Sequence, residues 1–133
     1  MTGLTLEMKG LIEKLESLPK ETEQRMVKEL RVTGLMIETD YKIAVPVDTG
    51  RLRSSIHTEH SDFRNFTYND KQGNMFDGKL SIDPNDRQVV VGTNVVYSTK
   101  IEIEGGKIMG KDALSNAFKK NTSGLLDRLL KLI

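Results

Sequence analysis

The chain of 133 residues carries 20 Lys and Arg against 19 Asp and Glu, so its net charge of +1 creates no overall field that favours nucleic acid or an anionic membrane. It has no cysteine, which excludes a disulfide framework, a thiolate metal site and a cysteine nucleophile. With 37% hydrophobic and 29% charged residues, we expect one domain, residues 1–133, that either packs a thin core or shares its apolar surface with a partner. No apolar run approaches the ~20 residues that cross a bilayer, and the first ten residues do not resemble a signal peptide.

The N-terminal third predicts two helices. From Leu6 to Leu18 apolar residues recur at steps of three and four, which predicts a helix that ends near Ser17. Pro19 interrupts the pattern and suits the first turn of a second helix, because its missing N–H would be unpaired there. The second helix is predicted to end near Ala44, since Pro46 disfavours helical geometry in the residue before it. Its apolar stripe consists of Val27, Leu30, Gly34, Ile37, Tyr41 and Ala44.

Gly34 is the unusual member of this stripe. A glycine inside a helix costs about 1 kcal/mol relative to alanine. We therefore expect that another element approaches the helix closely at Gly34.

The middle of the chain predicts short strands. Ser54–His60 is mildly β-prone, Lys79–Asp83 and Gln88–Gly92 predict a hairpin around Pro84-Asn85-Asp86, and Val95–Ile103 predicts a further strand. Between them, residues 60–78 are predicted to form a long flexible loop. Its large apolar side chains favour an arm that orders on a partner, although a disordered insertion is the alternative. These side chains are Phe63, Phe66, Tyr68, Met75 and Phe76.

The last segment, from Asp112 onward, predicts an amphipathic helix with a break near Ser123-Gly124, and residues 120–133 form its helical tail. The predicted fold class is therefore α+β. It comprises a long N-terminal helix broken near Pro19, a small antiparallel sheet of three to four strands with a long loop, and a C-terminal helix packed on the sheet. So small a sheet cannot cover the long helices, so part of their apolar surface is expected to lie between subunits.

The motif with the strongest claim to chemistry is Asp48-Thr49-Gly50, which also occurs in retropepsin-like aspartic proteases. There two close carboxylates share a proton. Here Arg51 and Arg53 follow, and these cations would keep both carboxylates ionised. About forty residues of predicted helix also precede the motif, whereas a retropepsin is nearly all β. We favour a turn, followed by a short helix or the start of a strand at Arg51–Ser55, with Gly50 in a conformation other residues resist.

The remaining candidates for chemistry match no standard site. His57, His60 and Asp62 lack the spacing of a zinc site. Glu102 and Glu104 would share one strand face, where solvation or a salt bridge between subunits is expected. A third set, Lys42, Arg51 and Arg53, forms a small basic cluster that could touch phosphate. Gly105-Gly106-Lys107 is too short for a phosphate-binding loop. The sequence thus predicts no enzyme, with no catalytic, cofactor or metal-binding residues.

Four segments of the sequence resemble the HK97 gp10-like family of bacteriophage neck or tail-completion proteins. The run from Ala44 to Ile56 (AVPVDTGRLRSSI) resembles the family signature, and Val89–Tyr97 (VVVGTNVVY) resembles its second block. Ile101-Glu102 stands where the family has a glutamate five residues after the tyrosine, and Ala113–Ala117 (ALSNA) resembles the start of its last helix. The order and spacing of the blocks agree over roughly residues 20 to 120.

The resemblance implies a structural virion protein of a tailed phage or prophage that joins head and tail at the neck. It would form a homo-oligomeric ring, assembled in the bacterial cytoplasm, that binds a connector or adaptor, the tail terminator or the tail tube. A module that touches DNA in the neck lumen is the alternative. Pro46, Asp48, Thr49 and Gly50 would form the structural joint. The candidate interface residues are Arg51, Arg53, Tyr97, Glu102, Phe63, Phe66 and Phe76, and we hypothesise that Arg51 or Arg53 pairs with Glu102 within or between subunits.

Overall fold

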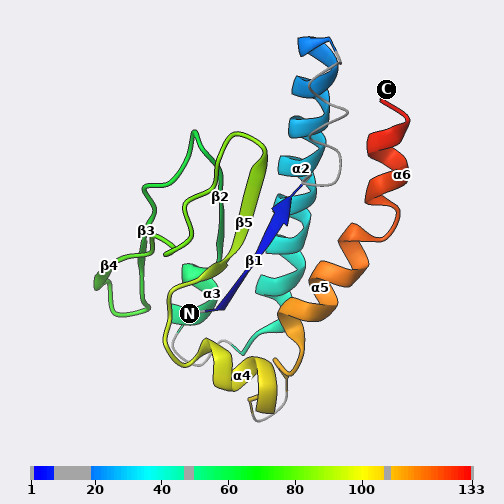
Figure 1. The fold of residues 1–133 in the computed structure, drawn as a ribbon. Coiled ribbons are helices and arrows are strands. Elements are labelled where there is room, and N and C mark those ends of the chain that lie inside the picture. The colour runs from blue at the N-terminus through cyan, green and yellow to red at the C-terminus, as the bar shows by residue number, and fades with distance from the viewer. Residues whose placement is uncertain (1, 8–18, 47–49, 107–108, 133) are drawn as a thin grey trace.

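The computed structural model describes residues 2–7, 19–46, 50–106 and 109–132, and within these ranges the chain has the predicted α+β class (Figure 1). A long helix lies between a small sheet and two C-terminal helices. The strands are β1 (Thr2–Glu7), β2 (His57–Glu59), β3 (Thr67–Asn69), β4 (Met75–Asp77) and β5 (Gln88–Thr93). The helices are α2 (Lys20–Ala44), α3 (Arg51–Ser55), α4 (Ser98–Glu104), α5 (Ala113–Thr122) and α6 (Leu125–Leu130).

Helix α2 confirms the second predicted helix. Pro19 precedes it, Glu21 and Glu23 place negative charge in its first turn, and Val45 is already extended. Leu30, Gly34, Ile37 and Tyr41 of the predicted stripe are buried, and Val27 and Ala44 are partly buried. Of the first predicted helix, residues 8–18 lie outside the described residues. Leu6 and Glu7 belong to β1 instead, where Leu4–Glu7 alternates apolar and polar residues at the spacing of a strand.

The main sheet is antiparallel with the strand order β1-β5-β2. Thr2 pairs with Thr93 and Glu7 with Gln88 on one side of β5, while His57 pairs with Gly92 on the other. The predicted hairpin of Lys79–Asp83 with β5 is wrong, because both edges of β5 in this sheet pair with strands distant in sequence. Lys79–Asp83 forms no strand, although Leu80 is buried as its alternating pattern suggested.

Residues 60–78, predicted as a flexible irregular loop, contain the hairpin β3–β4. Thr67 pairs with Asp77, and Asn69 with Met75. Asp70 closes the turn, because its carboxylate accepts hydrogen bonds from the backbone N–H groups of Gln72 and Asn74 at 3.0 and 2.9 Å. The polar composition of this segment therefore reflects turn chemistry.

Val95–Ile103, predicted as a strand, contains a turn and then helix α4. The hydroxyl oxygen of Thr93 accepts a hydrogen bond from the N–H of Val95 at 3.1 Å, and the N–H of Ser98 bonds to the Val95 carbonyl at 3.1 Å. These turn bonds end β5 and redirect the chain. The β-branched residues that suggested a strand are thus overruled by local hydrogen bonding and tertiary packing.

The predicted C-terminal helix and its break are confirmed, with α5 ending before Ser123 and Gly124 in a left-handed conformation at φ 77°. Both helices pack against α2, rather than chiefly on the sheet (Figure 1). Polar bonds support this packing. The amide nitrogen of Asn121 lies 2.7 Å from an Asp40 carboxylate oxygen, and Arg128 Nε lies 2.8 Å from Glu29 Oε1.

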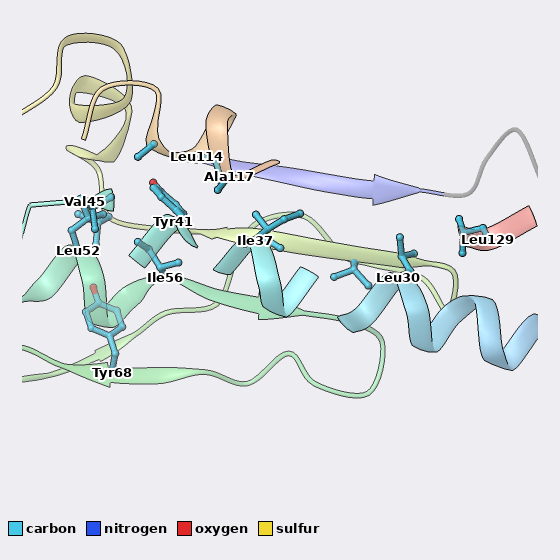
Figure 2. Close-up of a cluster of buried hydrophobic side chains, with 14 of the residues drawn as sticks. Leu30, Ile37, Tyr41, Val45, Leu52, Ile56, Tyr68, Leu114, Ala117 and Leu129 are labelled. Carbon is cyan, nitrogen blue, oxygen red and sulfur yellow. The ribbon is translucent and has the colours of Figure 1, made fainter. Parts of the chain in front are cut away.

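The hydrophobic core lies where α2 meets the other elements (Figure 2). Ile37 and Tyr41 project from α2 toward Leu114 and Ala117 of α5 on one side, and Ile56 reaches the core from the start of β2. These five side chains are at most 4% exposed. The core therefore depends on α2 contacting both of its neighbours at once.

Gly34 provides the predicted close approach. A Cβ atom at this position would lie 2.6 Å from Val89 Cγ1 and 3.1 Å from Thr58 Cγ2, and the Thr58 hydroxyl donates to the Gly34 carbonyl at 3.2 Å. The sheet therefore packs directly against the α2 backbone at this point.

We predict that Gly34→Ala destabilises the protein by about 1–2 kcal/mol, because overpacking outweighs the gain in helix propensity. Urea unfolding at neutral pH measures the change. Combining it with Val89→Ala should cost less than the sum of the two single changes, since the shortened side chain makes room. Lys28→Ala, an exposed change in the interior of the same helix, is the control. Additive costs in the double variant would contradict the close contact.

A second prediction concerns Asp40. The hydrogen bond from Asn121 lowers the pKa of Asp40, with a further contribution from the charge of Lys120. A lowered folded pKa adds stability that is present above the unfolded value of about 3.9 and is lost as pH falls through the folded value. Asn121→Ala should therefore cost about 1 kcal/mol at pH 7 and less at pH 3. The measurement is urea unfolding at both pH values, and an equal cost at both would contradict the assignment.

Candidate interaction surface

The joint after α2 is fixed by Arg53 and by two glycines, Gly106 and Gly110, which lie between α4 and α5 in the sequence. Arg53 donates from Nη2 to the Val45 carbonyl at 3.2 Å, which binds α3 to the end of α2. A Cβ at Gly106 would lie 2.6 Å from Pro46 Cγ, and one at Gly110 would lie 2.9 Å from Pro46 Cδ. One side of the proline ring is thus covered by backbone that only glycine allows so close.

Of the four residues predicted to form the joint, Asp48 and Thr49 lie outside the described residues. Pro46 is packed as above, and Gly50 precedes α3 with φ 72°, the left-handed conformation expected of it. The short helix at Arg51–Ser55 is the first of the two alternatives left open by the sequence.

Arg51 connects the joint to the hairpin. Its Nε donates to the Tyr68 hydroxyl at 3.2 Å, and its guanidinium carbon lies 4.2 Å from the centre of the Phe76 ring. Tyr68 and Phe76 stack with 5.3 Å between their ring centres. The bond to Tyr68 raises the pKa of Arg51, so a permanent cation lies on an aromatic surface.

A groove of about 440 Å³ opens beside this cation. Three predicted interface residues, Arg51, Phe76 and Tyr97, meet there although they are far apart in sequence, and Tyr97 is 40% exposed. Asp70 adds a carboxylate. Burial alone would raise the pKa of Asp70, but hydrogen bonds from Asn74 and Gln72 and the charge of Arg51 lower it overall. The groove therefore presents a positive charge on Arg51 and a negative charge on Asp70 beside apolar side chains. The other lining residues are Pro46, Leu52, Gln72 and Ile101.

Phe63 and Phe66 do not reach this groove. Phe66 stacks on the buried His57 with 3.9 Å between ring centres, and Phe63 meets Phe66 edge-on at 6.5 Å. Both line a second groove of about 280 Å³ beside α2. The expectation of an unattached aromatic arm is therefore wrong for Phe66 and Phe76, which pack against the core, whereas Phe63 remains 43% exposed.

Glu102 binds the start of α5. Its two carboxylate oxygens accept hydrogen bonds from the N–H groups of Leu114 and Ser115 at 2.8 and 3.1 Å, and from the Ser115 hydroxyl at 2.8 Å. A carboxylate at a helix N-terminus accepts hydrogen bonds from otherwise unpaired N–H groups, and its negative charge interacts favourably with the helix dipole. The hypothesised pairing of Glu102 with Arg51 or Arg53 is thus not formed within the chain. Glu102 and Glu104 also belong to helix α4, not to a strand.

The basic cluster is not formed as one patch. Lys42 pairs with Glu38 of the same helix at 3.3 Å, while Arg51 and Arg53 make the contacts described above. His57 and His60 also have different partners. His57 pairs with Glu59, whereas His60 Nδ1 accepts a hydrogen bond from the backbone N–H of Asp62 at 3.2 Å. Among the described residues, no three His, Cys, Asp or Glu side chains gather as a metal site would require.

Sequence reasoning missed an apolar stripe on the outer face of α2. Val32, Leu35, Met36 and Ile43 are 42–64% exposed there. At about 100° per residue they fall within roughly 100° of the helix circumference, on the side away from the buried stripe. The spacing was readable in the sequence, but only the fold shows which of the two stripes is left uncovered.

A comparison with family models decides the relationship. Residues 9–103 match the model described as "Bacteriophage HK97-gp10, putative tail-component". The chain belongs to the HK97 gp10-like family. No match was found among curated proteins or solved structures.

Membership places this gp10-like chain among bacteriophage tail components with a structural role. The matched range contains α2, α3, the hairpin and β5, and so includes the joint and every named lining residue of the 440 Å³ groove. Over the described residues, no helix combines the length and apolarity that a membrane span needs.

We predict that Glu102→Ala lowers stability by about 1–2 kcal/mol, because the N–H groups at the start of α5 lose their acceptors. Thermal or urea unfolding measures this change. Glu104→Ala, an exposed change in the same helix, is the matched control and should stay within about 0.5 kcal/mol. If both variants lose the same stability, Glu102 does not act as the acceptor.

Proposed function

We propose that this gp10-like protein is a tail-completion subunit at the neck of a tailed phage or prophage, where it joins head and tail as part of a homo-oligomeric ring. The observation that carries the proposal is the uncovered apolar stripe of α2 in a member of a phage tail family. Its partners would be a connector or adaptor on one side and the tail terminator or tail tube on the other. Assembly would take place in the host cytoplasm, with the virion as its final location.

The stripe supports assembly because it places four large apolar side chains together in solvent on one face of a helix. Val32, Leu35, Met36 and Ile43 are adjacent along one helix, whereas isolated exposed apolar residues need no explanation. Burial of such side chains between protein surfaces is favourable by roughly 25 cal/mol per Å² of apolar area. The stripe is therefore the surface we assign to subunit contact.

The groove at Arg51, Phe76 and Tyr97 supplies a second surface. It lies outside α2 and combines charged with aromatic side chains, whereas the stripe is apolar. A ring needs two different surfaces on each subunit, since its contacts are heterologous and close by rotation. Aromatic and arginine side chains are enriched at such interfaces. We assign the groove either to the neighbouring subunit or to the next ring of the neck.

A structural rather than catalytic role agrees with the contacts of the charged residues, which bind other parts of the same chain. Glu102 binds the start of α5, Arg53 binds the end of α2, and Arg51 lies against Tyr68 and Phe76. With a net charge of +1, contact with packaged DNA would be secondary to protein contacts.

The test is assembly of a Leu35→Lys/Met36→Lys variant. We expect it to remain folded, because both side chains are exposed, and to lose ring formation when mixed with the connector of the same phage. Sedimentation velocity and electron microscopy give the mass and shape. The matched control is Leu126→Lys on α6, an exposed leucine outside the stripe, which should assemble normally.

Two results would contradict the proposal. Normal rings from the double lysine variant would remove the stripe from the interface. Failure of the unaltered protein to bind any connector, terminator or tail-tube protein from its own phage would remove the neck assignment itself.

A further inference from the structure

Helix α4 holds two large apolar side chains in solvent on its outer face. Val96, shortly before the helix, is 88% exposed, and Ile103 is 65% exposed. The residue that joins Val96 to the helix already has right-handed helical torsion angles. A step of seven residues is close to two helical turns, so the two side chains lie one above the other, about 10 Å apart. The fold uses the inner face, because Ser98 is buried, Ile101 packs against the core and Glu102 binds α5.

The outer stripe of α2 contains an apolar pair with the same spacing. Met36 and Ile43, which are 47% and 64% exposed, are also seven residues apart. Two helices pack when the side-chain ridges of one fit into the grooves of the other, so equal spacing lets the two pairs interdigitate. All four side chains are exposed in a single subunit, so they do not cover one another. Contact between the α2 pair and the α4 pair therefore requires a second copy of the chain.

An acidic and a basic residue accompany each apolar pair, and their order is opposite on the two helices. On α2, Glu38 comes four residues before Lys42, and the two side chains pair at 3.3 Å. On α4, Lys100 comes four residues before Glu104, and both are exposed. The charge pattern of α4 therefore complements that of α2 when the two helices run in the same direction.

The alignment of the apolar pairs brings these charges together. When the two pairs lie side by side with the helices in the same direction, Lys100 is offset from Glu38 by two residues, about 3 Å along the axes. Glu104 has the same offset from Lys42. In the opposite direction, Glu104 would be displaced from Lys42 by seven residues, about 10 Å. Apolar spacing and charge order therefore favour the same arrangement.

We propose that the outer face of α4 in one copy packs against the outer stripe of α2 in the next copy, with the two helices running in the same direction. This inference rests on the proposed ring and identifies its subunit contact. The stripe follows the long helix, whereas α4 lies at the end of the molecule where α2 ends (Figure 1). Each copy therefore offers a different surface to each neighbour, and repetition of such a heterologous contact closes a ring.

The contact also assigns the Arg51 groove. Tyr97 follows Val96 in the sequence and lines that groove. A neighbour seated on Val96 therefore meets the groove from the same side. Of the two roles considered for the groove, the inference selects contact with the neighbouring subunit over contact with the next ring.

Disulfide cross-linking tests the contact, because the chain has no cysteine and every thiol is an introduced one. Single variants Ile43→Cys and Ile103→Cys are mixed with the connector of the same phage, oxidised mildly and separated on a denaturing gel. We expect cross-linked dimers from this mixture, and also from Met36→Cys mixed with Val96→Cys. A disulfide needs Cβ atoms within about 4.5 Å, so distant residues do not join.

Two mixtures serve as controls. Met36→Cys with Ile103→Cys should stay monomeric, because only helices in opposite directions would bring these residues together. Leu126→Cys with Ile103→Cys should also stay monomeric, because Leu126 is exposed but lies outside the stripe. A cross-link in either control, or between copies of one single variant, would overturn the proposal.

The outcomes separate this contact from the proposed function. Normal rings in the electron microscope without the Ile43–Ile103 cross-link would overturn the contact and leave the proposed function standing. The cross-link in a protein that binds no neck or tail protein of its phage would support the contact and remove the neck assignment. Absence of both rings and cross-link would overturn both.

Charge reversal gives a second readout. Lys42→Glu and Glu104→Lys should each raise the concentration for half-maximal assembly about fivefold, because each places like charges across the contact. The double variant Lys42→Glu/Glu104→Lys restores an opposite pair between copies, so its assembly should return to within about twofold of the unaltered protein. Sedimentation velocity measures all three variants. Losses that simply multiply in the double variant would contradict the contact.

Discussion

The contact between Gly34 and the sheet is the constraint on which the rest of the structure depends. Val89 and Thr58 lie against the α2 backbone there, at distances that a methyl group would violate. This approach brings the buried face of α2 onto β2 and β5 at once. Because Ile37 and Tyr41 then reach Leu114 and Ala117 on the other side, one helix organises both halves of the core (Figure 2).

Charged side chains fix the irregular segments around that core. Glu102 holds the start of α5, Glu59 holds the segment after the hairpin, and Arg53 holds the end of α2. A chain with 37% hydrophobic residues cannot secure every connection by apolar burial. Hydrogen bonds to charged groups are stronger than those between neutral groups, so these few residues stabilise connections that carry little apolar surface.

These bonds within the subunit also explain which side chains remain exposed on its surface. Residues predicted to face partners, such as Phe66 and Glu102, are used inside the subunit, whereas Tyr97 and the outer stripe of α2 remain exposed. The proposed assembly role therefore rests on side chains that the isolated fold does not need. Arg51 has both roles, because it supports the hairpin within the subunit and also lines the exposed groove.

Local patterns in the sequence determined α2 and its end, the close approach at Gly34, the left-handed Gly50 and the break near Gly124, because spacing and backbone sterics act over a few residues. The family blocks likewise identified the chain correctly. Only the tertiary structure decided that β5 pairs with β1 and β2 and that Glu102 binds α5. Those outcomes depend on partners distant in sequence, whose contacts outweigh the weak preferences of short segments.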